Sequence, residues 1–367
     1  MIPIADIGIG PFDIPWLEST LILTTPILLA AIGELISERA GVLNVGLEGM
    51  MLAGAFFSFL VAYETGSLVL GAVGGVAAGV LFGVVMAVLA VEARADQIVS
   101  GVGINIAAIG LTTFLFDQIF GLKGLIELER IGSVAIPGLS SIPEVGPALF
   151  DHDLLLYFAF LAVPLAGVLL YRTKWGLSIR AAGETPAAVD TAGVSVRRIR
   201  WAGVLTASAM AALAGVFLTL VTLGIFRQEM TAGRGFLALV AVIFGRWHPV
   251  GVLGACLVLG GTDALQLRLA GRGVVAPEVW LVLGAVGAGF VAHELARHRW
   301  RRPLPLSLSA AGAVVGLVLF ATAPRIELPS ELWRALPFLI ALVVLAGSLA
   351  RARMPTMLTL PYRRGAG

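Results

Sequence analysis

Acidic and amide side chains stand inside apolar stretches of this sequence, where their chemistry needs a reason. The stretch GELISERAGVLNVGLEGMM (33–51) joins two apolar segments and carries Glu34, Glu38, Arg39, Asn44 and Glu48. A charged group at the centre of a bilayer costs about 2.5–3.5 kcal/mol on insertion scales, so it normally has a partner or water. Glu38 and Arg39 suit an ordinary turn at the membrane surface. Asn44 and Glu48 lie deeper among glycines, where an interrupted helix could expose polar backbone to a cavity.

Motifs for metal binding, nucleophilic catalysis and ATP hydrolysis are missing from the sequence. No glycine-rich turn ends in Gly-Lys-Ser or Gly-Lys-Thr, the phosphate loop of many ATPases. No Gly-x-Ser-x-Gly elbow occurs. Metal-ligand spacing with Cys or carboxylates is lacking around the four histidines, His152, His248, His293 and His298. We therefore expect no catalytic residue, metal site or cofactor in this chain.

The composition is that of a membrane protein. Of the 367 residues, 58% are hydrophobic and 13% are charged, and the mean hydropathy is +0.96. A soluble domain carries about 25% charged residues. Helices of about 20 apolar residues span a bilayer, and the sequence predicts them near 20–37, 45–63, 68–91, 97–120, 153–171, 201–223, 235–247, 249–269, 278–296, 305–323 and 332–350. We expect an all-α, polytopic membrane helix bundle of about 9–11 spans, in which 235–247 is short enough for a half-helix.

The basic residues favour one orientation, because cytoplasmic loops carry an excess of Lys and Arg. If the loop 172–200 is cytoplasmic, the other basic clusters fall on the same side: Arg39, Arg94, Arg246, 297–302 and 351–364. The N-terminus, which has three acids before residue 20 and no cation, then lies outside with the Gly- and Pro-rich loop 121–152. We expect that loop to be irregular. The predicted location is the plasma or inner membrane, with the C-terminus in the cytoplasm.

The stretch RAAGETPAAVDTAGVSVRRIR (180–200) predicts one short helix in the basic loop. Thr185 can cap it, Pro186 suits the first helical position, and Gly193 can end it in a left-handed turn. Elsewhere, glycine recurs every four residues at Gly71, Gly75, Gly79 and Gly83. This ridge lets another helix approach closely, and we expect it to pack inside the bundle, with a dimer contact as the weaker alternative.

Four stretches resemble, in order, the permeases of the branched family of ATP-binding cassette (ABC) importers: SERAGVLNVGLEGMM, ADQIVSGVGIN, GLSIRAAGETPAAVDTAGVSV and TAGRGFLALVAVIFGRWHPVG. That family serves simple sugars, branched-chain amino acids and nucleosides. The sequence is most similar to the second permease of nucleoside importers that use a basic-membrane-protein-type lipoprotein as receptor. The resemblance implies a permease subunit that moves a nucleoside, or a related small polar solute such as a simple sugar, into the cytoplasm.

The resemblance also implies partners and a role for the short helix. ATP hydrolysis belongs to a separate ATPase subunit, and the other partners are a second homologous permease in a heterodimer and an extracytoplasmic solute-binding lipoprotein. In such transporters a short cytoplasmic coupling helix docks into the ATPase. The positions that match here are Gly183, Glu184, Pro186, Ala187, Ala188 and Gly193.

Neutral solutes call for amides, hydroxyls and aromatic faces along a transport path. The candidates beside the interrupted helices are Asn44, Glu48, Asn105, Thr231 and Phe236, with Glu48 as an internal hydrogen-bond anchor. The same Asn residues could instead tie helices together. A different alternative for the whole chain is a self-sufficient secondary transporter in which Glu48 or Asp117 carries protons.

The sequence departs from the family between about 273 and 327, where the chain has enough apolar sequence for two further helices. We expect a two-helix insertion there, within a single transmembrane permease domain (1–367) whose coupling loop is 172–200.

Overall fold

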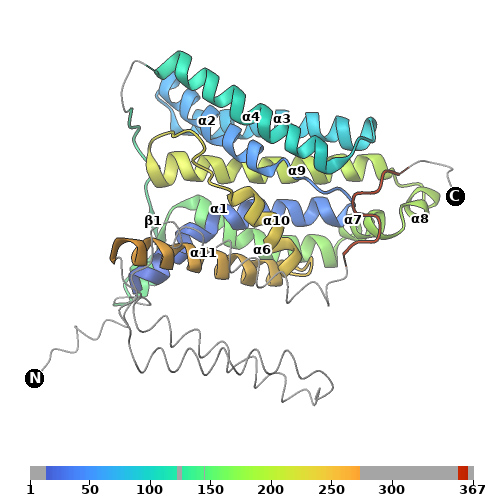
Figure 1. Ribbon diagram of the computed structural model, residues 1–367. Coiled ribbons are helices and arrows are strands. Elements are labelled where there is room, and N and C mark those ends of the chain that lie inside the picture. Colours follow the sequence, from blue (N-terminus) through green and yellow to red (C-terminus); the bar gives the residue numbers. More distant parts are fainter. Residues whose placement is uncertain (1–13, 122–125, 144, 273–353, 363–367) are drawn as a thin grey trace, which may run out of the picture. The chain divides into compact units, whose positions relative to one another are not determined.

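The computed structural model describes residues 14–121, 126–143, 145–272 and 354–362 (Figure 1). The chain groups into two compact units, 1–19 with 262–337, and 20–261 with 338–367. In the first unit the described residues are the ends of two helices. The second unit contains the helix bundle.

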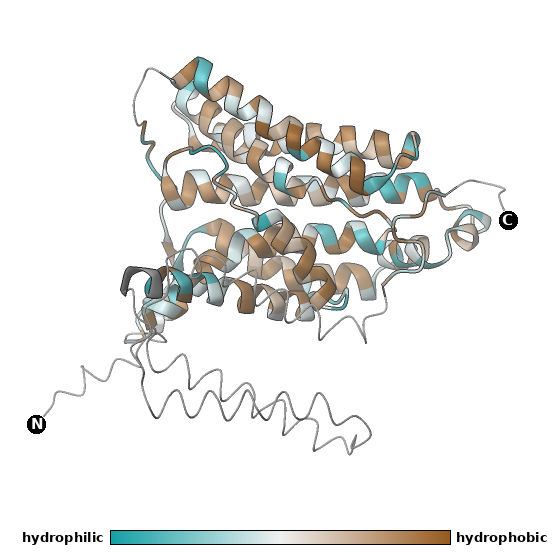
Figure 2. Cartoon of the chain, viewed as in Figure 1, coloured by the Kyte–Doolittle hydropathy of each residue, from teal (hydrophilic) through white to brown (hydrophobic). Residues whose placement is uncertain are grey.

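Seven of the described helices are long and apolar enough to cross a membrane. They are α1 (Ile14–Arg39), α2 (Leu47–Thr65), α3 (Leu68–Ala87) continued by the π-helical η2 (Val88–Glu92), α4 (Gln97–Phe120), α6 (Leu154–Arg172), α9 (Val196–Val216) continued by the π-helical η3 (Phe217–Leu223), and α11 (Pro249–Arg272). The predicted half-helix is α10 (Arg234–Phe244). Helices thus occupy all the predicted segments up to 269, and the brown of their ribbons in Figure 2 marks most of their residues as hydrophobic. The segments predicted near 278–296, 305–323 and 332–350, and the insertion 273–327, lie outside the described residues.

The glycine ridge of α3 packs inside the bundle against α2 and α9, which confirms the expectation for it. A Cβ added at Gly75 would lie 2.5 Å from the carbonyl oxygen of Gly54 in α2. A Cβ at Gly79 would lie 2.3 Å from the Cβ of Ala212 in α9. Such distances are shorter than any real contact, so the three helices pack backbone to backbone, as small residues permit in membranes.

The opposite faces of α3, α4 and α6 are exposed and apolar. The exposed fractions there reach 74% at Val69, 70% at Val99 and 64% at Leu154. A surface of this kind is unfavourable in water and typical of contact with lipid or another membrane helix.

The loop between α4 and α6 contains more regular structure than predicted. The short helix α5 (Val145–Phe150) lies in it, and β1 (Val134–Ala135) pairs antiparallel with β2 (Asp151–His152) in the register Val134↔His152. Asp153 then caps α6 by accepting a hydrogen bond from Leu156 N at 2.9 Å. Burial raises the pKa of this carboxyl group, and the backbone hydrogen bond lowers it. The expectation of a wholly irregular loop is therefore wrong.

Replacing Gly79 with valine tests the ridge. We expect a loss of about 1–3 kcal/mol in unfolding free energy, because the new side chain must push α9 away. Gly103→Val is the matched control, since it puts the same residue in a helix where nothing lies within 4 Å of the new Cβ. Thermal unfolding in detergent measures both variants, and equal midpoints would contradict the packing described for the ridge.

Candidate functional site

The link between the end of α1 and the start of α2 runs alongside the first turns of α4, inside the bundle. Leu43 N donates to the side-chain oxygen of Gln97, the first residue of α4, at 2.8 Å. Gly49 N donates at 2.8 Å to Asn105 Oδ1, which lies about 12 Å further along α4 at 1.5 Å per residue. Residues 40–46 are not helical. The predicted interruption is confirmed, and the first turn of α2 lies level with the interior of α4.

Glu48 holds this first turn of α2 against the N-terminus of α10. Its Oε1 accepts a hydrogen bond from Gly233 N at 2.8 Å and its Oε2 accepts one from Gly235 N at 2.7 Å. The side chain is 8% exposed. The first N–H groups of a helix have no partner within the helix and carry partial positive charge, so a carboxylate satisfies both needs. A Cβ on Gly235 would lie 2.5 Å from Glu48 N, so only glycine allows this approach.

Two buried Asn side chains bind the backbone of residues 40–49, which lead from α1 into α2 and which we call the crossover. Asn105 accepts from Gly49 N and donates from Nδ2 to Val45 O at 3.0 Å. Asn44 Oδ1 accepts from Gly46 N at 3.1 Å. Glu34 completes the set, because its Oε1 accepts from Asn44 N at 2.7 Å. These contacts favour the alternative in which the amides tie the broken helix to its neighbours.

The remaining path candidates lie around α10. Thr231 is 1% exposed and its carbonyl accepts from Arg234 N at 3.0 Å, which helps to start the helix. Phe236 is 43% exposed. The structure therefore gathers Asn44, Glu48 and Asn105 at one junction, while Phe236 alone among the five candidates presents an accessible aromatic face.

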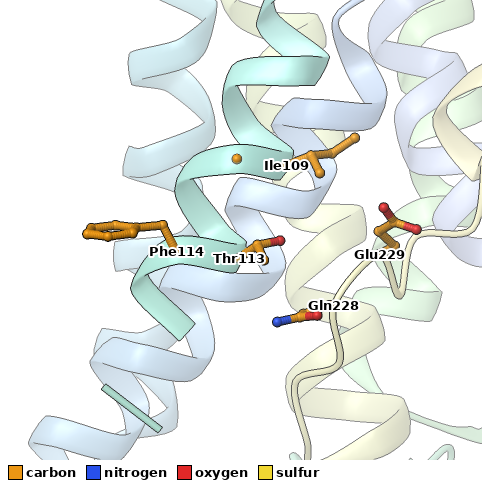
Figure 3. A pocket seen from close by; sticks show the side chains of 6 residues that line it. Ile109, Thr113, Phe114, Gln228 and Glu229 are labelled. Carbon is orange, nitrogen blue, oxygen red and sulfur yellow. The ribbon is translucent and has the colours of Figure 1, made fainter. Parts of the chain in front are cut away.

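A hollow of about 610 Å³ lies between α4 and the loop that leads to α10. Figure 3 shows Gln228 and Glu229 of that loop opposite Thr113 of α4, with the Phe114 ring pointing away from them. Gln228 Nε2 donates to Asp117 Oδ1 at 2.9 Å. Asp117 is exposed, so it lacks the buried setting that a proton-carrying acid in a membrane requires.

The other end of α10 is held by a second acid, which lies near the end of α1. Trp247, in the turn between α10 and α11, donates from Nε1 to Glu38 Oε2 at 2.5 Å. Arg39 Nη2 and Nε donate to the Trp247 carbonyl at 2.6 and 3.0 Å. Arg246 and Trp247 adopt left-handed φ values of 53° and 55°, a conformation that costs non-glycine residues about 1–2 kcal/mol each. Glu38 is 1% exposed, so the expectation of an ordinary surface turn is wrong for this residue.

The coupling loop contains two helices where the sequence predicted one. α7 (Lys174–Glu184) precedes α8 (Pro186–Thr191). Pro186 begins α8, and Gly193 has the predicted left-handed φ of +79°. Thr185 makes no side-chain capping hydrogen bond, so its predicted role is wrong. The missed helix does carry a signal, because Thr173 Oγ1 caps it by accepting from Gly176 N at 3.0 Å.

The six coupling candidates divide between two environments. Gly183 is buried against α1, where an added Cβ would lie 2.3 Å from Arg39 O. Pro186 is also buried. The four exposed candidates are Glu184, Ala187, Ala188 and Gly193. The outward face of α8 is therefore made of small side chains, which permit close approach of a partner.

Residues 16–292 match the model of the family described as "Branched-chain amino acid transport system / permease component". The chain belongs to this family. It is 39% identical to the guanosine ABC transporter permease protein NupQ of Bacillus subtilis, over 68% of this chain and 81% of that protein. It is 40% identical to the nucleoside ABC transporter permease protein NupC of Lactococcus lactis, over 65% and 78%. It is 41% identical to the putative glucose ABC transporter permease protein TsgC13 of Haloferax volcanii, over 69% and 77%. No solved structure matches.

Family membership fixes the class of protein. The chain is a multi-pass membrane protein and the permease component of an ABC importer, and it is not the ATPase. Such a permease works with an ATPase subunit and a partner permease. The alternative of a self-sufficient secondary transporter is thereby excluded.

Replacing Glu48 with alanine tests the junction. We expect a loss of about 2–3 kcal/mol in unfolding free energy, because two buried backbone N–H groups lose a charged acceptor. Glu48→Gln should recover only part of the loss, since one of its two side-chain ends is a donor. Glu64→Ala is the matched control, because Glu64 is an exposed acid at the far end of the same helix. Chemical unfolding in detergent gives the comparison, and similar values for Glu48→Ala and Glu64→Ala would rule out the anchor.

Proposed function

We propose that the permease moves a nucleoside into the cytoplasm. The observation that carries this proposal is that two of the three relatives at about 40% identity are named as guanosine or nucleoside permeases. The third relative is named as a putative glucose permease at 41% identity, so a simple sugar is the second candidate. Nucleosides and sugars are both neutral and rich in hydroxyl groups.

The partner permease in this proposal is a different protein from this chain. Bacillus subtilis, Lactococcus lactis and Haloferax volcanii each have a second named permease, and the chain is only 24–26% identical to those. Because the chain is 39–41% identical to one member of each pair, it corresponds to one of two distinct subunits. In the complex that we propose, this chain forms a heterodimer with the second permease and works with an ATPase and an extracytoplasmic lipoprotein receptor.

The proposed orientation puts the coupling loop in the cytoplasm and the N-terminus outside. The end of α1, the turn before α11 and the coupling loop meet at one end of the bundle, as Arg39 contacts both Trp247 and Gly183. The basic residues of these elements therefore share one face, which supports the positive-inside orientation. At this face α8, with Ala187, Ala188 and Gly193 exposed, would dock into the ATPase.

The proposed solute path passes the junction of α2, α4 and α10. Half-helices that meet inside a membrane protein frame many transport sites. Phe236 offers a π-face for a nucleobase, beside the turn that Glu48 and Thr231 hold. Asn44 and Asn105 shape the path by fixing the crossover, since both amides already bind backbone. Alternating access follows when the docked ATPases close and rock the bundle.

Uptake by the reconstituted complex tests the solute. The permease, its partner permease, the ATPase and the receptor are placed in vesicles with ATP on the ATPase side. We expect ATP-dependent accumulation of labelled guanosine, with competition by other nucleosides and none by glucose. The receptor-free complex is the control. Glucose accumulation without guanosine accumulation would replace the nucleoside with the sugar.

Replacing Gly193 with proline tests the coupling role of α8. Proline cannot adopt the φ of +79° found here, so the exit of α8 must distort. We expect uptake to fall at least tenfold while the permease stays folded in the membrane. Gly138→Pro is the matched control, because Gly138 has a φ of +84° in the loop between α4 and α6. Normal ATP-driven uptake by Gly193→Pro would contradict docking through α8.

A further inference from the structure

The last described segment, 354–362, lies across the coupling loop, and we call it the strap. Pro355 and Leu358 anchor it by burial. It bonds to α7, α8 and α9 in turn, through Met357 N to Gly183 O (2.8 Å), Tyr362 OH to Asp190 Oδ2 (3.3 Å), and Arg200 Nη1 to Leu360 O (2.9 Å). One short segment thus connects all three elements of the loop.

Glu184 faces the strap. Its Oε2 accepts from Thr356 Oγ1 at 2.6 Å and from Thr356 N at 3.2 Å. A carboxylate that accepts two hydrogen bonds from one residue fixes that residue's backbone and side chain together. Glu184 is one of the positions that match the family's coupling helix. Its described hydrogen bonds nevertheless go to Thr356 of the same chain.

The coupling helix needs such support, because it is very short. α8 has six residues, of which Pro186 and Val189 are buried. Isolated helices below about 12–15 residues are marginal in water, so tertiary contacts must set the direction of α8. The bundle supplies one such contact, where Gly183 lies against Arg39. The strap supplies another, where Tyr362 OH donates to Asp190 Oδ2 of α8.

We propose that the strap is a positioning element for energy coupling, and that Thr356 and Glu184 are its key pair. The strap holds the end of α7 and the start of α9, so that α8 meets the ATPase in one orientation and transmits its closure. This proposal rests on the proposed coupling role of α8. In this proposal Glu184 orients α8 through the strap and does not itself contact the ATPase.

A double-mutant cycle separates these two roles of Glu184. The variants are Thr356→Val, Glu184→Met and the two combined, in the full chain with its ATPase and partner permease; methionine keeps the length of the side chain and removes the carboxylate acceptor. Thr359→Val is the matched control, because it makes the same change three residues away, on an exposed side chain. Two quantities are measured: solute taken up per ATP hydrolysed, and the rate at which trypsin cuts the loop 172–200 of the permease alone.

We expect each single variant to lower uptake per ATP about two- to tenfold, as loss of one hydrogen bond does. The combined variant should be no worse than either single one, because both changes remove the same contact. Trypsin should cut the loop faster in all three variants and at the normal rate in Thr359→Val. Thr356→Ser should restore uptake per ATP, which a merely general loss of folded protein would not explain.

Two results would overturn the proposal. If Thr356→Val matched Thr359→Val in uptake per ATP, the strap would have no part in coupling. If the effects of Thr356→Val and Glu184→Met added fully, Glu184 would act on the ATPase directly. Absence of ATP-driven uptake in the unaltered complex would instead contradict the proposed function, and the trypsin rates would still show whether the strap orders the loop.

Discussion

The arrangement of the bundle depends on one electrostatic contact, the Glu48 carboxylate at the N-terminus of α10. Inside a bilayer no water is available for exposed N–H groups, so a helix that begins there must have another acceptor. Glu48 provides it from the first turn of a second broken helix, and the partial positive charge of the α10 N-terminus stabilises the ionised carboxylate in return. The buried start of α2 thus supplies the acceptor that the buried start of α10 needs, and the N–H groups of α10 in turn solvate the Glu48 side chain. Loss of this contact would leave two buried N–H groups of α10 without an acceptor.

Residues at the end of α1 also hold the opposite end of α10. The half-helix therefore has a carboxylate at each end, Glu48 at its N-terminus and Glu38 at the turn that follows it. Glu38 holds Trp247 and Arg39 holds the Trp247 carbonyl, which supports the two left-handed residues of the turn. Tyr171 stacks on His248 with ring centroids 5.4 Å apart, and the Arg180 guanidinium lies 5.0 Å from the Tyr171 ring. The contacts are thus continuous from α7 of the coupling loop to the turn after α10. These contacts pack α7 against the turn that holds the C-terminal end of α10.

The sequence predicted those features that depend on neighbouring residues. Apolar length was enough to place the described spans, and the backbone preferences of Pro186 and Gly193 were enough to place α8. Thr185 was predicted wrongly because it ends α7 and precedes α8 at once, with a φ of −140° that does not direct its hydroxyl to the helix. The burial of Glu38 depends on Trp247, 209 residues later, and the role of Glu184 depends on Thr356, 172 residues later. Pattern and propensity contain no information about such pairs.

The charge balance at the junction bears on what can pass it. Glu48 lies where α2 and α10 begin, and both of its oxygens accept backbone hydrogen bonds. The acid is therefore suited to a fixed structural role, and the energy for transport has to come from elsewhere. The proposed path is bordered by amides and a carboxylate that already bind backbone N–H groups and by the exposed ring of Phe236. This lining suits neutral solutes with hydroxyl groups and flat rings, which is the chemistry of a nucleoside.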